Sequence, residues 1–102
     1  MFKWRYYMVH YVLLKFKAGT DVDAIELNMR ETYRQLEQEL PFLTEPFVWR
    51  NCVDRDSNAD IMATIHLDNA TQLKDYLTHP LHVAMADNFK DAVVTRISFD
   101  HE

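Results

Sequence analysis

The chain has 102 residues, of which 48% are hydrophobic and 26% are charged, and this balance indicates a single globular domain with a modest core. The net charge of −5 argues against a nucleic-acid reader, because such proteins need clustered Lys and Arg. No apolar run approaches the ~20 residues that a membrane-spanning helix needs. Cys52 is the single cysteine, so no disulfide can form within the chain, and the reducing cytoplasm is the expected location.

The first predicted strand covers residues 7–17, where aromatic and β-branched side chains are frequent. Its positions are apolar on both faces: His10 shares one face with valine and leucine, and Tyr11 lies on the other. Because both faces are apolar, we expect other parts of the protein, or a partner, to cover each of them.

A helix is predicted from residue 22 to residue 40, where apolar residues recur at steps of three and four. Pro41 should end this helix. Thr20 and Asp23, three positions apart, resemble a capping box at its start, with Asp in place of the usual Glu.

Two more strands are predicted over residues 46–53 and 60–67, and the polar run 54–58 between them indicates a hairpin with a long loop. Cys52 falls within the first of these strands. We therefore expect it to be a small core side chain rather than a nucleophile.

A further helix should begin after Asp68 and Asn69 and carry Tyr76 on its apolar side. His79 and Pro80 interrupt it, because the residue before a proline is disfavoured in the helical region and proline suits the first turn of a new helix. The apolar side of this second segment is formed, at spacings of three and four, by His82, Met85 and Phe89.

The last predicted strand covers residues 92–100, with Val93, Thr95, Ile97 and Phe99 on one face. The order of elements is then that of an α+β ferredoxin-like fold, βαββαβ, with a four-stranded antiparallel sheet. Both helices would cover one face of the sheet and leave the other apolar face bare. Because a bare apolar face marks an interface, we predict a homodimer through this sheet face.

Two segments carry a family resemblance. Residues 8–17, MVHYVLLKFK, followed by Tyr76-x-x-His79-Pro80-x-His82, resemble the stress-responsive dimeric α+β barrel (Dabb) domain family. The resemblance implies ferredoxin-like subunits whose sheets pair into a homodimeric α+β barrel.

The resemblance also implies the division of the chain. A single Dabb-like domain would cover residues 8–102, and residues 1–7 would form an N-terminal extension. Trp4, Tyr6 and Tyr7 of this extension are candidates for contact with the partner chain, and a disordered tail is the alternative.

The family is functionally mixed, and many of its members have no assigned activity. One plant branch consists of cofactor-free polyketide cyclases that close a ring by intramolecular aldol condensation. Carried over from that branch, the base would be His82, with Tyr76 and His10 lining the cavity. A further cavity histidine of that branch falls by spacing on Ile61, so the sequence departs from the cyclase pattern there.

The residue types themselves fit proton transfer beside a carbonyl. A neutral imidazole with an ordinary pKa of ~6.5 can take a proton near neutral pH, and a phenol can donate a hydrogen bond to the enolate oxygen that forms. We predict His82 as the catalytic base and Tyr76 as the polarising donor. The predicted substrate-binding residues are His10, Ile61, Met85 and Phe89.

Two other interpretations of these residues stay open. One is a ligand-binding site without chemistry. The other is a structural role for His82 and Tyr76 at the helix break, which is the role we assign to His79 and Pro80.

Clustered histidines are also used as metal ligands. His79 and His82, with His10 or His66 as a third ligand, form the candidate set. The proline between the first two disturbs the helix, and no other spacing supports a metal site. We therefore predict neither a metal nor a cofactor.

The leading functional prediction is a small cytoplasmic homodimer that binds a small, largely apolar molecule between sheet and helices. If it is an enzyme, cofactor-free cyclase, lyase or isomerase chemistry is expected. The alternative is a non-catalytic, stress-associated structural dimer. Neither nucleic acid nor a membrane is expected as a partner.

Overall fold

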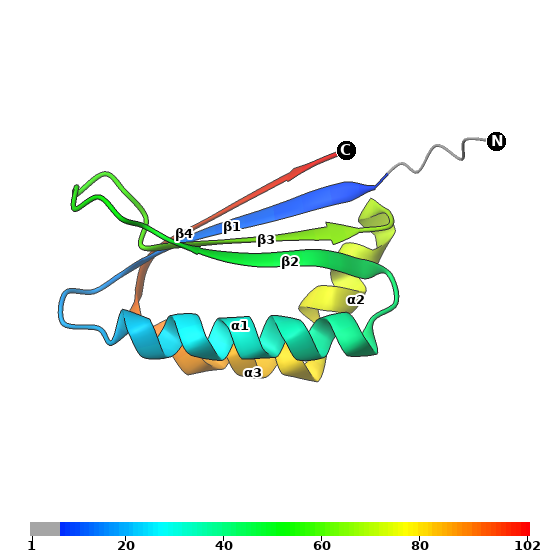
Figure 1. Ribbon diagram of the computed structural model, residues 1–102, viewed down its shortest axis with the longest axis horizontal. Helices are drawn as coiled ribbons and strands as arrows, with labels where there is room; N and C mark the ends of the chain where they lie inside the picture. The colour runs from blue at the N-terminus through cyan, green and yellow to red at the C-terminus, as the bar shows by residue number, and fades with distance from the viewer. Residues whose placement is uncertain (1–6) are drawn as a thin grey trace.

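A computed structural model describes residues 7–102 (Figure 1). Of the predicted extension, residues 1–6, including Trp4 and Tyr6, lie outside the described residues. The elements follow in the order β1 (Met8–Phe16), α1 (Val22–Glu39), β2 (Leu43–Arg50), β3 (Ile61–Leu67), α2 (Leu73–Leu77), α3 (Pro80–Phe89) and β4 (Val93–His101). Two 3-10 turns, Ala70–Gln72 and Lys90–Ala92, come before α2 and after α3. The predicted α+β ferredoxin-like order is confirmed.

The four strands form one antiparallel sheet in the order β2-β3-β1-β4. All three helices lie on the same side of this sheet (Figure 1), where α1 packs against both β2 and α3. β4 is an edge strand and is exposed along nearly its whole length. No helix within residues 7–102 has the length and apolar character needed to cross a membrane.

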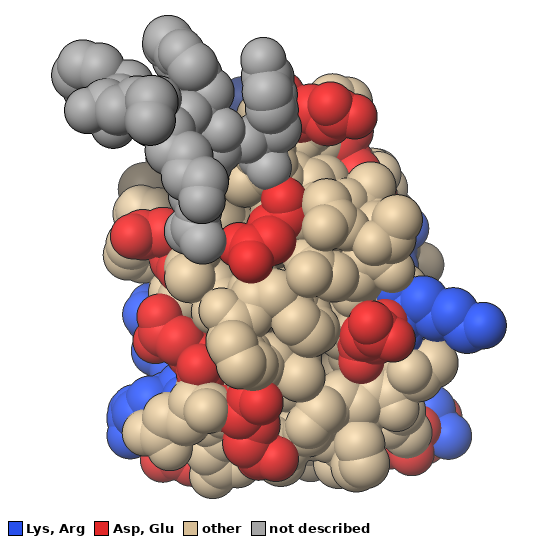
Figure 2. Space-filling view, turned by 90° about the vertical axis from the view of Figure 1, so that its right-hand side faces the viewer, with Lys and Arg blue, Asp and Glu red and all other residues tan. Residues whose placement is uncertain are grey.

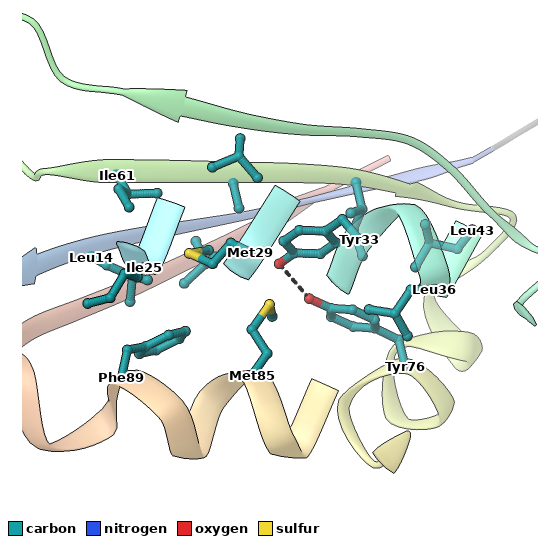
Figure 3. Packing of buried hydrophobic residues seen from close by; sticks show 14 of the residues in the cluster. Leu14, Ile25, Met29, Tyr33, Leu36, Leu43, Ile61, Tyr76, Met85 and Phe89 are labelled. Carbon is teal, nitrogen blue, oxygen red and sulfur yellow. Dashed lines mark hydrogen bonds between the residues drawn. The ribbon is translucent and has the colours of Figure 1, made fainter. Parts of the chain in front are cut away.

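The core lies between the sheet and the helices (Figure 3). β1 sends alternate side chains into it, and Leu14 is fully buried. The predicted apolar stripe of α1 is confirmed, with Met29 and Leu36 at its centre. Burying a side chain of this size contributes about 1.5–3 kcal/mol, so the stripe is what holds α1 on the sheet.

The start of α1 differs from the predicted capping box. Asp21 is the N-cap, and its carboxylate accepts a hydrogen bond from the backbone N–H of Ala24 at 3.1 Å. Thr20 instead donates its hydroxyl hydrogen back to the carbonyl oxygen of Lys17. Asp is the better cap here because its charge also complements the positive end of the helix dipole.

β2 begins three residues earlier than predicted and ends at Arg50. Its pairing with β3 shifts register between Thr44 and Phe47, and Glu45 there has a positive φ of 51°. An irregularity of this kind lets an edge strand contain Pro46, which has no N–H to donate. Because the strand ends early, the prediction that Cys52 is a core side chain is wrong: it lies exposed in the following loop.

β4 also departs from the predicted alternation. Thr95 pairs with Lys15, but Val93 pairs with Phe16, so the register shifts by one residue between them. Val93 therefore lies against the core, whereas Ile97 and Phe99 lie on the opposite face. The prediction that all these residues share one face is wrong at Val93.

The face of the sheet away from the helices is rich in exposed large hydrophobic side chains. The register places Phe99 opposite Tyr11 and Ile97 opposite Leu13. On β2, Phe47 and Trp49 lie on the same face and are also exposed. We call this surface the open face.

Candidate functional site

Three of the predicted site residues meet at one end of the core. His10 comes from β1, Tyr76 from α2 and His82 from the first turn of α3. The ring centroids of Tyr76 and His82 are 4.6 Å apart, and those of His10 and Tyr76 are 5.8 Å apart, in edge-on contacts. All three side chains are buried. We call these three residues the His–Tyr cluster.

The break between α2 and α3 brings Tyr76 and His82 together. α2 ends at Leu77, and His79 forms the N-cap of α3, its Nδ1 accepting a hydrogen bond from the N–H of Leu81 at 3.1 Å. Pro80 occupies the first turn, as the spacing predicts. Nε2 of His79 lies 3.5 Å from a carboxylate oxygen of Glu39 on α1, so both ring nitrogens have partners outside the cluster.

The ring of His82 is held in one tautomer. Its Nδ1 lies 3.0 Å from the carbonyl oxygen of Leu77. A carbonyl can only accept, so Nδ1 carries the hydrogen and Nε2 of the neutral ring keeps its lone pair. Within residues 7–102 this is the ring's one hydrogen bond. Burial is the main cause that lowers the pKa of His82, and the charge of Arg96 lowers it further, so the neutral ring is favoured near pH 7.

Tyr76 is not isolated in the core. Its hydroxyl oxygen lies 2.8 Å from that of Tyr33 on α1 (Figure 3). Burial raises the pKa of Tyr33 to about 12 and raises the pKa of Tyr76 well above 10. Both phenols therefore stay protonated. Because one hydroxyl donates to the other, one O–H of the pair remains to donate elsewhere.

His10 is held by a residue that the sequence did not suggest. Its Nδ1 lies 2.5 Å from Oδ1 of Asp100, the residue directly opposite on β4. The side chain of His10 is 6% exposed and that of Asp100 is 37% exposed, so the cluster reaches solvent along the β4 edge. The alternation of the last strand gave one indication of this contact. Asp100 is out of phase with Ile97 and Phe99, so its side chain lies on the helix side of the sheet.

Arg96 shares that phase with Asp100 and so lies on the helix side of β4. Its positive charge reaches the cluster. Burial raises the pKa values of Tyr33 and Tyr76, and the charge of Arg96 acts in the opposite direction on both. Any negative charge that forms beside these phenols is stabilised by the same field.

The remaining predicted substrate-binding residues do not all join the cluster. Met85 lies in the core one turn after His82. Ile61 pairs with Leu14, whereas His10 pairs with Ile65. Ile61 and Ile65 are four residues apart on β3, so Ile61 lies about 13 Å along the strand from the position opposite His10.

Phe89 also lies away from the cluster. It packs on Phe16 with ring centroids 6.1 Å apart. Figure 3 shows Ile61 and Phe89 toward the end of the core away from Tyr76. The two side chains belong to the core beyond the cluster.

Three hollows formed by the described residues are lined by none of the residues of the His–Tyr cluster. One of about 280 Å3 lies between α3 and β4, next to Arg96. Another of about 310 Å3 lies between α1 and β2 and is lined in part by Tyr33. A third, of about 360 Å3, lies at the β2–β3 hairpin and is lined by Trp49.

One end of the molecule is acidic at its surface. Figure 2 shows acidic side chains spread over the end of the molecule where β1 begins and β3 ends.

Among residues 7–102, no group of three His, Cys, Asp or Glu side chains is placed to hold a metal ion. His66 stacks on Tyr7 with ring centroids 4.6 Å apart, and its pairing with Val9 places it on the open face, away from His79 and His82.

Solved structures of similar shape come from several organisms. A dimeric protein of unknown function with a ferredoxin-like fold from Bacteroides fragilis has a TM-score of 0.80 at 23% identity, with 94% of this chain and 95% of that chain covered. A dimeric ferredoxin-like protein of unknown function from Thermobifida fusca has a TM-score of 0.78 at 18% identity, with coverages of 93% and 89%. The hydroxynitrile lyase of Passiflora edulis has a TM-score of 0.75 at 14% identity, with coverages of 95% and 93%.

At these identities the similar structures support the fold alone. No curated protein matches the chain. The sequence model of the stress responsive A/B barrel domain, Dabb, matches residues 8–102. The chain therefore belongs to the stress responsive A/B barrel domain family.

Proposed function

We propose that the chain is a cofactor-free proton-transfer enzyme of the lyase, cyclase or isomerase type. Its substrate would be a small, largely apolar carbonyl compound bound between the sheet and the helices. The observation that carries the proposal is the state of His82: a buried neutral imidazole, fixed at Nδ1 by the carbonyl of Leu77, whose Nε2 keeps its lone pair and whose ring lies against that of Tyr76.

The proposed step follows from these positions. Nε2 of His82 takes a proton from the carbon next to the carbonyl. The C–H bond breaks, its electron pair forms the enolate, and the proton stays on the imidazole. Either hydroxyl of the Tyr33–Tyr76 pair can be the donor. In this step Tyr33 donates to Tyr76, which leaves the Tyr76 O–H to donate to the enolate oxygen.

His10 would position the substrate in this scheme. Its ring is oriented by Asp100 through Nδ1, and its centroid lies 5.8 Å from that of Tyr76, so Nε2 is left to contact the substrate. Because this pair lies at the β4 edge, we infer that the substrate enters there. The hydroxynitrile lyase of Passiflora edulis, which has the same fold, supports the lyase class among the three.

The proposal includes a homodimer. The open face exposes Phe47, Trp49, Ile97 and Phe99 on one side of the sheet. A second copy of the chain is the natural cover for a patch of this kind. Dimeric proteins of the same fold from Bacteroides fragilis and Thermobifida fusca support this arrangement. We place the dimer in the cytoplasm, where the exposed thiol of Cys52 would stay reduced.

A second candidate function is a non-catalytic, stress-associated dimer. The observation that favours it is the burial of Tyr76, which is 1% exposed and already hydrogen-bonded to Tyr33. In that case the cluster would be a satisfied polar network that stabilises the helix break.

One experiment separates the two candidates. The protein is incubated with acetylacetone or acetophenone in D2O, and NMR follows deuterium incorporation next to the carbonyl. The wild type should accelerate exchange above the buffer rate, and His82→Asn should abolish this acceleration. Asn keeps a donor for the Leu77 carbonyl, so the fold is retained. Tyr76→Phe should slow exchange about a hundredfold, the effect of losing one oxyanion donor.

His66→Asn is the matched control, because it makes the same change on the other face of the sheet. It should exchange at the wild-type rate. If wild-type protein does not exceed the buffer rate with either compound, or if His82→Asn matches wild type, the enzymatic proposal is wrong and the non-catalytic dimer is favoured.

A further inference from the structure

The hollow between α3 and β4 lies beyond the His–Tyr cluster, toward the C-terminal end of α3. It has a volume of about 280 Å3 and is lined by Ala86, Asp87, Phe89, Lys90, Val93 and Arg96. Ala86 is one helical turn after His82, so the hollow begins one turn from the proposed base. Its apolar part is formed by Ala86, Phe89 and Val93, which pack on the core.

The charges in the hollow do not cancel. Lys90 Nζ lies 3.5 Å from a carboxylate oxygen of Asp87, so these two side chains form a pair. Arg96 is exposed and, among residues 7–102, forms no ion pair. One guanidinium therefore remains available, beside apolar surface and on the side of β4 that faces the cluster.

An available guanidinium beside apolar surface fits one class of ligand. Arg presents a planar fork of N–H donors that matches a carboxylate, and such charge-assisted hydrogen bonds are about twice as strong as neutral ones. The acidic end of the molecule in Figure 2 would repel the same ligand, which leaves the α3–β4 side as the favourable approach.

We propose that this hollow binds the carboxylate end of a small apolar acid and that Arg96 selects for that charge. The inference rests on the proposed function, because it names the substrate class of the same site. The apolar part of the ligand would lie over Ala86 and Phe89, with its reacting carbon directed toward His82. The positive charge that reaches the phenols of Tyr33 and Tyr76 would also stabilise the enolate.

Two probes of the same shape test the charge selection. Benzoate and benzamide are titrated into the full-length protein, and NMR follows the amide resonances of Ala86 and Lys90 and the Nε–H resonance of Arg96. We expect benzoate to shift all three resonances and to bind about tenfold more tightly than benzamide. Arg96→Gln should remove this preference, and Arg96→Lys should retain part of it.

Arg34→Gln is the control. Arg34 is an exposed arginine that lines a different hollow, between α1 and β2, so this variant should keep the tenfold preference. Equal affinities for benzoate and benzamide, no shifts at the three resonances, or an unchanged preference in Arg96→Gln would each overturn the inference.

The same titration in His82→Asn separates this inference from the proposed enzyme. Benzoate binding that depends on Arg96 should persist there, although deuterium exchange is lost. If the wild type shows that binding but no exchange, the enzymatic proposal fails while the anion site stands. If exchange occurs but benzoate has no preference over benzamide, the anion site is the part that fails.

Discussion

The hydroxyl oxygens of Tyr33 and Tyr76 lie 2.8 Å apart, and their hydrogen bond joins α1 to α2 inside the core. Changing either residue to Phe leaves the other hydroxyl buried without this partner. Each single variant should therefore lose about 1–3 kcal/mol of unfolding free energy. In the double variant both polar groups are gone, so its loss should be smaller than the sum of the two single losses.

Urea unfolding of the wild type, both single variants and the double variant gives the coupling free energy directly. An additive result would show that the two hydroxyls do not depend on each other. The Tyr33→Phe variant also informs the mechanism, because it removes the hydrogen-bond partner of the Tyr76 hydroxyl without touching the substrate. Its deuterium exchange should fall less than that of Tyr76→Phe.

The buried ring of His82 should make stability depend on pH. Burial lowers its folded-state pKa below the ordinary value of 6.5, so the unfolded chain takes up the proton first as pH falls. The stability that comes from the neutral ring is fully present above about pH 6.5. It is lost as the pH falls from there through the folded-state pKa. The urea midpoint of the wild type should therefore fall between pH 7.5 and pH 5.

His82→Asn should weaken this pH dependence, because the amide keeps the hydrogen bond to Leu77 but does not titrate. If the slopes of His82→Asn and the wild type coincide, the ring of His82 does not carry the effect.

The inward direction of Tyr76 and His82 could be predicted because it depends on local features. Helical spacing and the break at Pro80 are read from consecutive residues, and the structure confirms both. Asp100 could not be predicted as the partner of His10, because their contact depends on the register of strands 90 residues apart in the sequence. Tyr33 lies on the apolar stripe of α1, but its bond to Tyr76 requires the placement of α1 beside α2.

The errors in the strands have a similar physical cause. Glu45 adopts a positive φ, and the register shift around it lets β2 continue through Pro46. The shift at Val93 moves that side chain from one face of β4 to the other. Such irregularities are set by the neighbouring strand, so a regular alternation read along one strand misses them.

His79 should contribute to stability and not to turnover. Its side chain caps α3, and His79→Ala removes the acceptor for the N–H of Leu81, at a cost of about 1 kcal/mol of unfolding free energy. His79→Asn keeps a capping acceptor and should recover most of this loss. Urea unfolding measures both variants, and deuterium exchange should stay at the wild-type rate in each. A loss of exchange in the well-folded His79→Asn variant would give His79 a role in the site.

The open face should hold the dimer together. Phe99 is 59% exposed on this face, and Leu27 is 60% exposed on α1, so the two residues form a matched pair. Phe99→Glu would place a carboxylate in the interface, where its desolvation should cost about 2 kcal/mol or more and weaken the dimer ~30-fold. Leu27→Glu changes the helix surface alone and should leave the dimer intact.

Light scattering after gel filtration measures the mass of each variant. The wild type and Leu27→Glu should have the mass of two chains and Phe99→Glu that of one at low micromolar concentration. A monomeric wild type, or a Phe99→Glu variant that stays dimeric, would mean that the open face has a different occupant.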